Sequence, residues 1–254
     1  MQRSVALVLA SLSLVLLAFP LTLEKPGLPP TLKADEPAYY LMALSLARDG
    51  DLRVDSEDMA RAFDEFPYTR ISNLILMSGD GWRTAHYGKP YVYSLFAAPL
   101  AGPFGADGIL LFNMILLVAM IWMGAIYLQR WNPPWLAALF SAGFFLLSAG
   151  FAYGFWIQPE IFNMASVTAA LFLGFHRFDR FGQASAVEVS RDLESPVALA
   201  RFRGLIGDAA GVQGSHGLAH PALAFLSGAA LMPAVYAKPM VAALALPLLW
   251  IPLR

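Results

Sequence analysis

The polar part of this chain opens with the run Lys33-Ala34-Asp35-Glu36-Pro37-Ala38-Tyr39-Tyr40, directly after the first apolar segment. An acidic pair there meets the start of a helix, with Glu36 assigned as the N-cap because Pro37 suits the first helical position. Apolar side chains downstream are spaced to share one face, and Gly50 is well placed to end the helix. The pattern predicts an amphipathic helix over residues 37–49 that lies along a membrane interface.

The composition is that of a chain whose main solvent is lipid. Of its 254 residues, 58% are hydrophobic and only 14% are charged, and the mean hydropathy is +0.57. An average soluble domain has roughly 25% charged residues. Eleven of the 18 acidic residues lie between Leu21 and Tyr91, so that region must be in water or at the level of the lipid headgroups.

Several classes of protein are disfavoured by what the sequence lacks. There is no cysteine, which excludes a disulfide framework, a thiolate zinc site and a cysteine nucleophile. The net charge is -1 and no basic run indicates a nucleic-acid partner. No Gly-x-Gly-x-x-Gly motif follows a strand, so a nucleotide-binding Rossmann unit is not expected.

The apolar segments predict an all-α fold, a polytopic transmembrane helical bundle with about five or six membrane segments. Residues 108–128 and 135–157 are strong spans and residues 161–175 a weaker one, whereas residues 91–104 are too short to cross. The first segment is either a cleaved signal peptide or an uncleaved membrane helix. No Ala-x-Ala site follows it, which favours the helix, with Arg3 in the cytoplasm.

The expected organisation has five parts. They are a first transmembrane helix (1–23), an extracytoplasmic loop with amphipathic interfacial helices (24–90), transmembrane helices (91–176), a cytoplasmic loop (177–220) and further membrane segments (221–254).

Basic residues at the segment ends predict the orientation, because cytoplasmic ends carry the excess of Lys and Arg. If residues 91–104 do not cross, one side collects Arg3, Arg130, Arg177, Arg180 and Arg254. The same threading places Asp35, Glu36 and Glu160 together on the opposite side.

The candidate catalytic residues are the carboxylates Asp35, Glu36 and Glu160. A carboxylate at the end of a membrane span is suited to taking a proton from an acceptor hydroxyl. For Glu36 the alternative is a helix cap, and for Glu160 it is a solvated loop position. A carboxylate so close to hydrocarbon is costly unless it is hydrated or paired, which favours a functional interpretation of Glu160.

The candidate donor phosphate-binding residues are the cations Arg83, His86, Lys89 and Lys238. Cations stabilise the charge that develops on a departing phosphate. The alternative is that they anchor the chain at the membrane interface beside aromatic residues. Asn113 and Asn163, inside predicted spans, are interpreted as hydrogen-bonding contacts between helices. Too few carboxylates converge to predict a metal site, so no cofactor is included.

Two runs of the first loop carry a family resemblance. One is Asp35-Glu36-Pro37-x-Tyr39-Tyr40-Leu41 followed by Ser45-Leu46-Ala47-Arg48-Asp49-Gly50-Asp51-Leu52, and the other extends from Asp80-Gly81 through His86-Tyr87-Gly88-Lys89-Pro90 to Gly105. Together they resemble the first outside loop of the GT-C membrane glycosyltransferases, which include the protein O-mannosyltransferases and the aminoarabinose transferases of lipid A. The resemblance covers roughly residues 3–175, and more loosely the rest.

This resemblance implies an enzyme of the bacterial inner membrane with a cytoplasmic N-terminus. It would transfer a sugar, with inversion, from a polyprenyl-phosphate donor to a hydroxyl of a lipid, glycan or protein acceptor on the periplasmic face. Asp35 would be the general base or acceptor-orienting residue, Glu36 its acidic neighbour and Glu160 the second acidic residue.

The chain also departs from the family, whose members have more spans than the roughly six apolar stretches found here, which fits a truncated form. The alternative from another class is a non-catalytic transporter or lipid-binding membrane protein. No internal repeat of the kind found in transporters is visible, and the charges cluster in the first loop.

Overall fold

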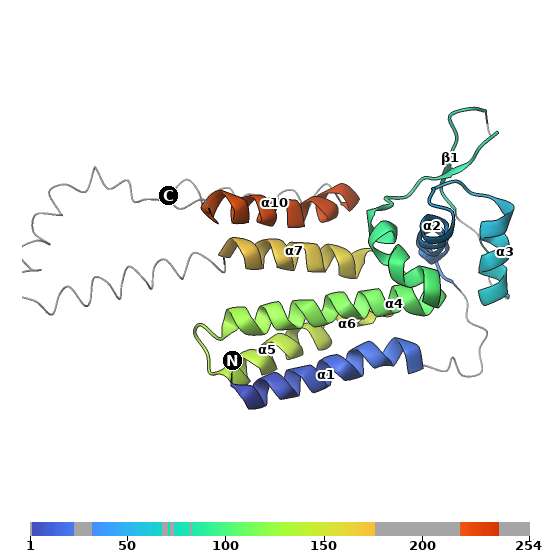
Figure 1. Cartoon of the computed structure of the whole chain (residues 1–254). Coiled ribbons are helices and arrows are strands. Elements are labelled where there is room, and N and C mark those ends of the chain that lie inside the picture. Colours follow the sequence, from blue (N-terminus) through green and yellow to red (C-terminus); the bar gives the residue numbers. More distant parts are fainter. Residues whose placement is uncertain are drawn as a thin grey trace, which may run out of the picture.

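The computed structural model describes residues 2–22, 32–67, 71, 74–81, 83–175 and 219–238. They form a mainly helical protein, in line with the all-α prediction, together with one short antiparallel ladder that this prediction did not include (Figure 1). The elements are α1 (Arg3–Thr22), α2 (Glu36–Arg48), α3 (Ser56–Glu65), β1 (Leu76–Met77), β2 (His86–Tyr87), α4 (Val92–Leu128), α5 (Pro134–Leu146), α6 (Ala149–Tyr153), α7 (Glu160–Phe175) and α10 (Ala219–Ala237).

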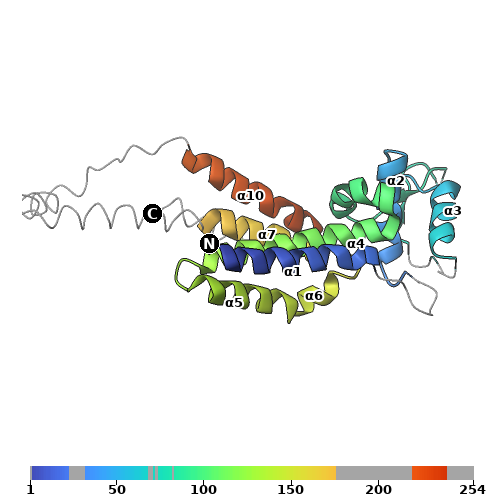
Figure 2. The ribbon, with the colours of Figure 1, turned by 60° about the horizontal axis from the view of Figure 1, so that its bottom comes forward.

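The elongated part of the molecule is a helical bundle built around α4. Helices α1, α5 and α7 pack on α4, and α10 packs on α7 (Figures 1 and 2). The chain begins at the end of the bundle where α4 gives way to α5, whereas α2 and α3 lie beyond the opposite end. The Arg130 guanidinium donates to the Phe175 carbonyl at 3.4 Å, so the C-terminal ends of α4 and α7 meet at the same end of the bundle.

Polar side chains inside the bundle hydrogen-bond across helices. The Trp122 indole N–H donates to the Ser13 hydroxyl at 3.0 Å, which joins α4 to α1. The Ser141 hydroxyl of α5 donates to the Ile121 carbonyl of α4 at 2.7 Å. The Ser227 hydroxyl of α10 is buried and donates to a carbonyl of α7. Such bonds satisfy buried hydroxyl groups where two helices approach closely.

Among the described residues, two helices, α1 and α4, are long and apolar enough to cross a membrane. The exposed surface of α1 consists largely of apolar side chains. Leu7 and Val8 are 68% exposed and Leu14 is 70% exposed. Helices α5 and α7 are apolar but shorter. The predicted span 240–253 and most of the predicted cytoplasmic loop 177–220 lie outside the described residues.

The prediction of one continuous span over residues 135–157 is wrong. Helix α5 ends at Leu146, and Ser148 begins the short helix α6 by accepting the Gly150 N–H at 3.2 Å with its hydroxyl. A serine that caps a new turn offers the backbone an alternative to continuing the helix, so hydropathy alone overestimates the length of this segment.

Helix α4 is broken at Gly105, whose φ of 58° and ψ of -135° are not helical. The two parts meet closely, because a Cβ added at Gly108 would lie 2.0 Å from the Leu100 carbonyl oxygen. Only glycine permits this backbone approach and conformation without strain. The break separates residues 92–104 from the long apolar part of α4, in line with the prediction that residues 91–104 are a distinct short segment.

Helix α2 is the core of a cap formed with α3 and the β1–β2 ladder. All its residues from Pro37 to Ser45 are buried, and Tyr40 and Leu41 are 0% exposed. The predicted interfacial helix with one exposed face is therefore wrong, because α3 and α4 also pack against α2. The predicted C-terminal signal is confirmed, since Gly50 follows α2 with a φ of 74°.

The start of α2 also differs from the prediction by one residue. The N-cap is Asp35, without a side-chain cap hydrogen bond, and Glu36 is the first helical residue. The second helix of this region, α3, begins with a capping box in which Asp55 accepts the Asp58 N–H and Asp58 accepts the Asp55 N–H. The Tyr87 hydroxyl donates to Asp58 at 3.0 Å and so fixes the ladder against α3.

Candidate functional site

One ion pair between predicted site residues lies where the cap begins. The Lys89 ammonium donates to Asp35 at 2.7 Å, and it brings the segment after β2 against the start of α2. The Lys89 side chain is 17% exposed and the Asp35 side chain 45% exposed. The lysine is thus the sheltered member of the pair, and the carboxylate is presented to solvent.

A second ion pair between predicted site residues lies at the start of α7. The Lys238 ammonium, directly after α10, donates to Glu160 Oε1 at 3.1 Å. Here the exposures are reversed, with 22% for the Glu160 side chain and 53% for the Lys238 side chain. Glu160 is therefore a paired residue rather than a freely solvated loop carboxylate.

Glu36, at the start of α2, accepts backbone hydrogen bonds from the segment before α2 and from the turn before α7. Its Oε1 accepts the Ile157 N–H at 3.1 Å, and its Oε2 accepts the Lys33 N–H at 2.7 Å. The first bond ties the start of α2 to the turn that precedes α7. Both carboxylate oxygens are thereby engaged, which is the arrangement of a positioning residue.

Tyr39, on α2, is close enough to Asp35 and Glu160 for both charges to act on its pKa. Its pKa is raised to about 12, first by burial and then by the negative charges of Asp35 and Glu160. Both carboxylates therefore act on one hydroxyl group. Because a pKa this high keeps the phenol protonated near neutral pH, Tyr39 retains an O–H donor there.

Aromatic contacts hold the same region together. The Tyr91 and Tyr236 rings meet edge to face, with centroids 5.9 Å apart, and link the residues after Lys89 to the end of α10. The Tyr39 ring packs in the same manner on Tyr93 of α4, at 5.7 Å. Together with the two ion pairs, these contacts connect the start of α2, the segment before α4, the start of α7 and the end of α10 into one neighbourhood.

The other two predicted phosphate-binding residues are located in the hairpin. The Arg83 N–H donates to Asp80 at 3.1 Å, and His86 is in β2 opposite Met77. Hydrogen bonds from Thr84 lead the causes that lower the pKa of Asp80 to about 2, and they stabilise this turn. No contact between described residues brings Arg83 or His86 to the ion pairs.

Sequence reasoning did not identify Tyr39, Tyr91 or Tyr236, and it gave Asn163 the same interpretation as Asn113. Asn113 accepts the Tyr93 hydroxyl across the break of α4 and donates to the Trp156 carbonyl in the turn between α6 and α7, so it joins the two parts of α4 and a turn rather than two separate helices. The amide of Asn163 is buried and has no hydrogen-bond partner in the described part of the chain. No sequence signal distinguishes two asparagines in apolar helices, because the difference lies in their neighbours.

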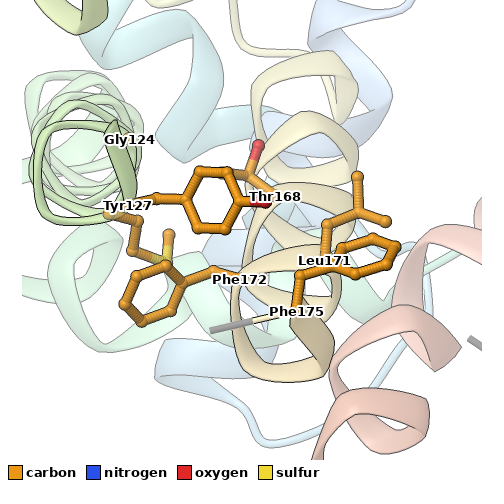
Figure 3. A pocket seen from close by; sticks show the side chains of 7 residues that line it. Gly124, Tyr127, Thr168, Leu171, Phe172 and Phe175 are labelled. Atoms are coloured by element: carbon orange, nitrogen blue, oxygen red, sulfur yellow. The ribbon is translucent and has the colours of Figure 1, made fainter. Parts of the chain in front are cut away.

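Two of the cavities that the described residues line are outside this neighbourhood. One, of about 350 Å³, lies beneath the cap and is lined by Tyr40, Leu44, Arg48, Arg61, Asp64, Glu65, Gly102, Pro103 and Gly105. The other, of about 270 Å³, is an apolar groove between α4 and α7, with the rings of Tyr127 and Phe172 at its wall (Figure 3). Over the residues described, no group of three or more His, Asp or Glu side chains could hold a metal ion.

Comparison with known proteins does not assign this chain to a family. No family model, no curated protein and no solved structure matches the chain.

Proposed function

We propose that the chain is a membrane glycosyltransferase that moves a sugar from a polyprenyl-phosphate donor to an acceptor hydroxyl. The observation that carries the proposal is the pair of oppositely presented charges, an exposed carboxylate at Asp35 and an exposed ammonium at Lys238. The transfer needs both, because one group must take a proton and another must stabilise a departing phosphate.

In this proposal the bundle crosses the bacterial inner membrane with five or six segments, of which α1 and α4 meet the length requirement by themselves. The apolar exposed surface of α1 supports a lipid environment for the bundle. The N-terminus and the α4–α5 turn are cytoplasmic, because Arg3 and Arg130 mark that end. The cap and both ion pairs then face the periplasm.

The proposed chemical roles follow from which side chain of each ion pair is exposed to solvent. The acceptor oxygen bonds to the anomeric carbon while the bond from that carbon to the phosphate oxygen breaks, and its electron pair leaves with the phosphate. The hydroxyl proton passes to Asp35, which Lys89 holds in place. Lys238 stabilises the leaving phosphate, and Glu160 anchors Lys238.

These roles refine the sequence-based assignment. Glu36 is proposed as a positioning residue, because backbone N–H groups occupy both its oxygens. Lys89 is proposed to orient the base rather than to bind phosphate. The resemblance of the first loop to GT-C glycosyltransferases supports the same function and the same location for the base.

One observation favours a second candidate function. The groove between α4 and α7 is apolar and lies on helices proposed to span the membrane, so a lipid chain would fit it without catalysis (Figure 3). The alternative is therefore a lipid-binding or transport protein.

An assay of the purified protein with a panel of polyprenyl-phosphate sugars separates these functions. We expect at least one donor to be consumed with release of the polyprenyl phosphate, and we expect Asp35→Asn to abolish consumption while donor binding remains. A protein that binds the lipids but consumes none, or an Asp35→Asn variant with the wild-type rate, would contradict the proposal.

A further inference from the structure

Two buried asparagines differ sharply in their surroundings. Asn113 is 0% exposed and its amide is hydrogen-bonded on both sides, to Tyr93 and Trp156. Asn163, on α7, is 7% exposed, and both Oδ1 and Nδ2 are buried without a partner among the described residues. Buried polar groups of folded proteins are nearly always hydrogen-bonded, so unpaired ones indicate a missing partner such as water or a ligand.

A third unpaired atom lies on the same helix. Glu160 Oε1 accepts Lys238, whereas Glu160 Oε2 is buried and has no partner in the part of the chain that the structure describes. Glu160 and Asn163 are one turn apart on α7, and side chains with this spacing are neighbours on one helix face. The first turn of α7 therefore combines two unpaired acceptors with an unpaired amide donor.

The chemistry of these atoms selects the kind of partner. Glu160 Oε2 and Asn163 Oδ1 both need a donor, which excludes a phosphate, whose oxygens only accept at neutral pH. Asn163 Nδ2 needs an acceptor, which excludes a cation. A hydroxyl group both donates and accepts, and neighbouring hydroxyls can satisfy all three atoms.

We propose that Asn163 and Glu160 Oε2 bind hydroxyl groups of the donor sugar. This inference rests on the proposed function and adds the position of the sugar. Lys238 is held by the other oxygen of Glu160, so a phosphate on Lys238 places its attached sugar next to these atoms. Glu160 then lies between the two parts of the donor, with the phosphate on one side and the sugar hydroxyls on the other.

The test compares binding of two probes, a polyprenyl phosphate and the same lipid bearing one hexose, to the full chain in detergent. We expect wild type to bind the sugar-bearing lipid more tightly, and Asn163→Leu to lose this preference by about tenfold or more because the buried hydrogen bonds of the amide are lost. Asn163→Leu is also expected to keep or raise the melting temperature, since it removes an unpaired buried amide.

Asn113→Leu is the matched control. It removes a satisfied amide from a buried site, so its melting temperature should fall while its preference for the sugar-bearing lipid stays at the wild-type level. If Asn163→Leu does not fold, Asn163→Ser provides the second variant. Its hydroxyl is shorter than the amide, so we expect the preference to fall.

The outcomes separate the inference from the function on which it rests. Undiminished preference for the hexose lipid in the Asn163 variants would overturn the inference and would assign the unpaired atoms to bound water. Failure of wild type to bind either lipid would instead overturn the proposed function, and the inference with it.

Discussion

Both ion pairs join a lysine to a carboxylate, but they differ in which of the two side chains is exposed to solvent. In the pair of the cap, the lysine is sheltered and the carboxylate of Asp35 is 45% exposed. In the pair of the bundle, the carboxylate is sheltered and the ammonium of Lys238 is 53% exposed. In each pair the sheltered charged group contacts a more exposed one. The exposed group is a carboxylate in the cap pair and an ammonium in the bundle pair.

Stability alone does not explain this arrangement. Partly exposed ion pairs contribute about 0–1 kcal/mol, so neither pair is needed to hold the fold. A bound group that requires a base on one side and a cation on the other accounts for both. The comparison predicts that variants of the two pairs fail in different ways, one in the chemical step and the other in binding.

The largest effect is expected for Asp35→Asn. The amide keeps the size of the side chain but cannot act as a base, so kcat should fall about 10²–10⁴-fold, the usual contribution of general base catalysis. Donor affinity should stay within about twofold, because the proposed phosphate contact is Lys238. The measurement is single-turnover transfer together with equilibrium donor binding. Glu57→Gln, a 76% exposed carboxylate on α3, is the control and should change neither value.

Lys238→Gln should show the complementary defect. Loss of a charge-assisted contact to phosphate weakens donor binding by about 10- to 100-fold. Titration of the donor against this variant measures the loss, and Lys238→Arg should restore part of the affinity. Arg83→Gln is the control, because the hairpin keeps Arg83 from the pairs. An equal loss in both variants would contradict the assignment of the phosphate to Lys238.

Gly105→Ala tests how the cap is held on the bundle. The φ of 58° suits only glycine here, and an added Cβ would lie 2.3 Å from Glu65 Oε2. Glu65 also accepts the Tyr40 hydroxyl and the Ala106 N–H, so its displacement would disturb two elements. Backbone strain of this kind costs about 1–3 kcal/mol, and we expect a loss of about 2 kcal/mol in thermal unfolding.

The matched control for that variant is Gly102→Ala. A Cβ added there meets only the Ala47 side chain, at 3.4 Å, and alanine favours the helix. Its stability should be unchanged or slightly raised. Equal stability of the two variants would show that the break at Gly105 imposes no conformational requirement.

Lys89→Met is expected to have the smallest effect. The apolar stem is retained and Asp35 loses the group that orients it, so kcat should fall about tenfold, which corresponds to about 1.4 kcal/mol. The unfolding free energy should change by about 1 kcal/mol or less, as for other partly exposed pairs. Loss of donor binding with an unchanged kcat would place the phosphate on Lys89 instead.

The sequence predicted much of this neighbourhood because its charges are rare in an apolar chain. Each of four charged residues stands out because it lies near a predicted membrane segment: Asp35, Glu160, Lys89 and Lys238. Their pairing was not predicted, because it depends on how α7 and α10 pack. Turn chemistry was predictable at Gly50, where one glycine ends a helix.

The remaining differences have the same origin in tertiary contacts. Hydropathy gave no sign that Ser148 interrupts an apolar segment by capping α6, since a single serine is common inside apolar helices. The spacing of the apolar side chains in α2 predicted one exposed face, but Ser45 is buried as well, because its hydroxyl donates to the Asp51 carbonyl inside the cap. Burial of polar groups with partners cannot be read from spacing alone.

The central claim is that the exposed member of the cap pair must be a carboxylate. The most direct test exchanges the two members of this pair, with Asp35→Lys and Lys89→Asp in one chain. The ion pair is retained, so the melting temperature should stay close to that of wild type, while the exposed group becomes a cation. The account predicts a folded protein without measurable sugar transfer from any donor that wild type consumes. Transfer at a rate near that of wild type would contradict it, because the exposed carboxylate would then be dispensable.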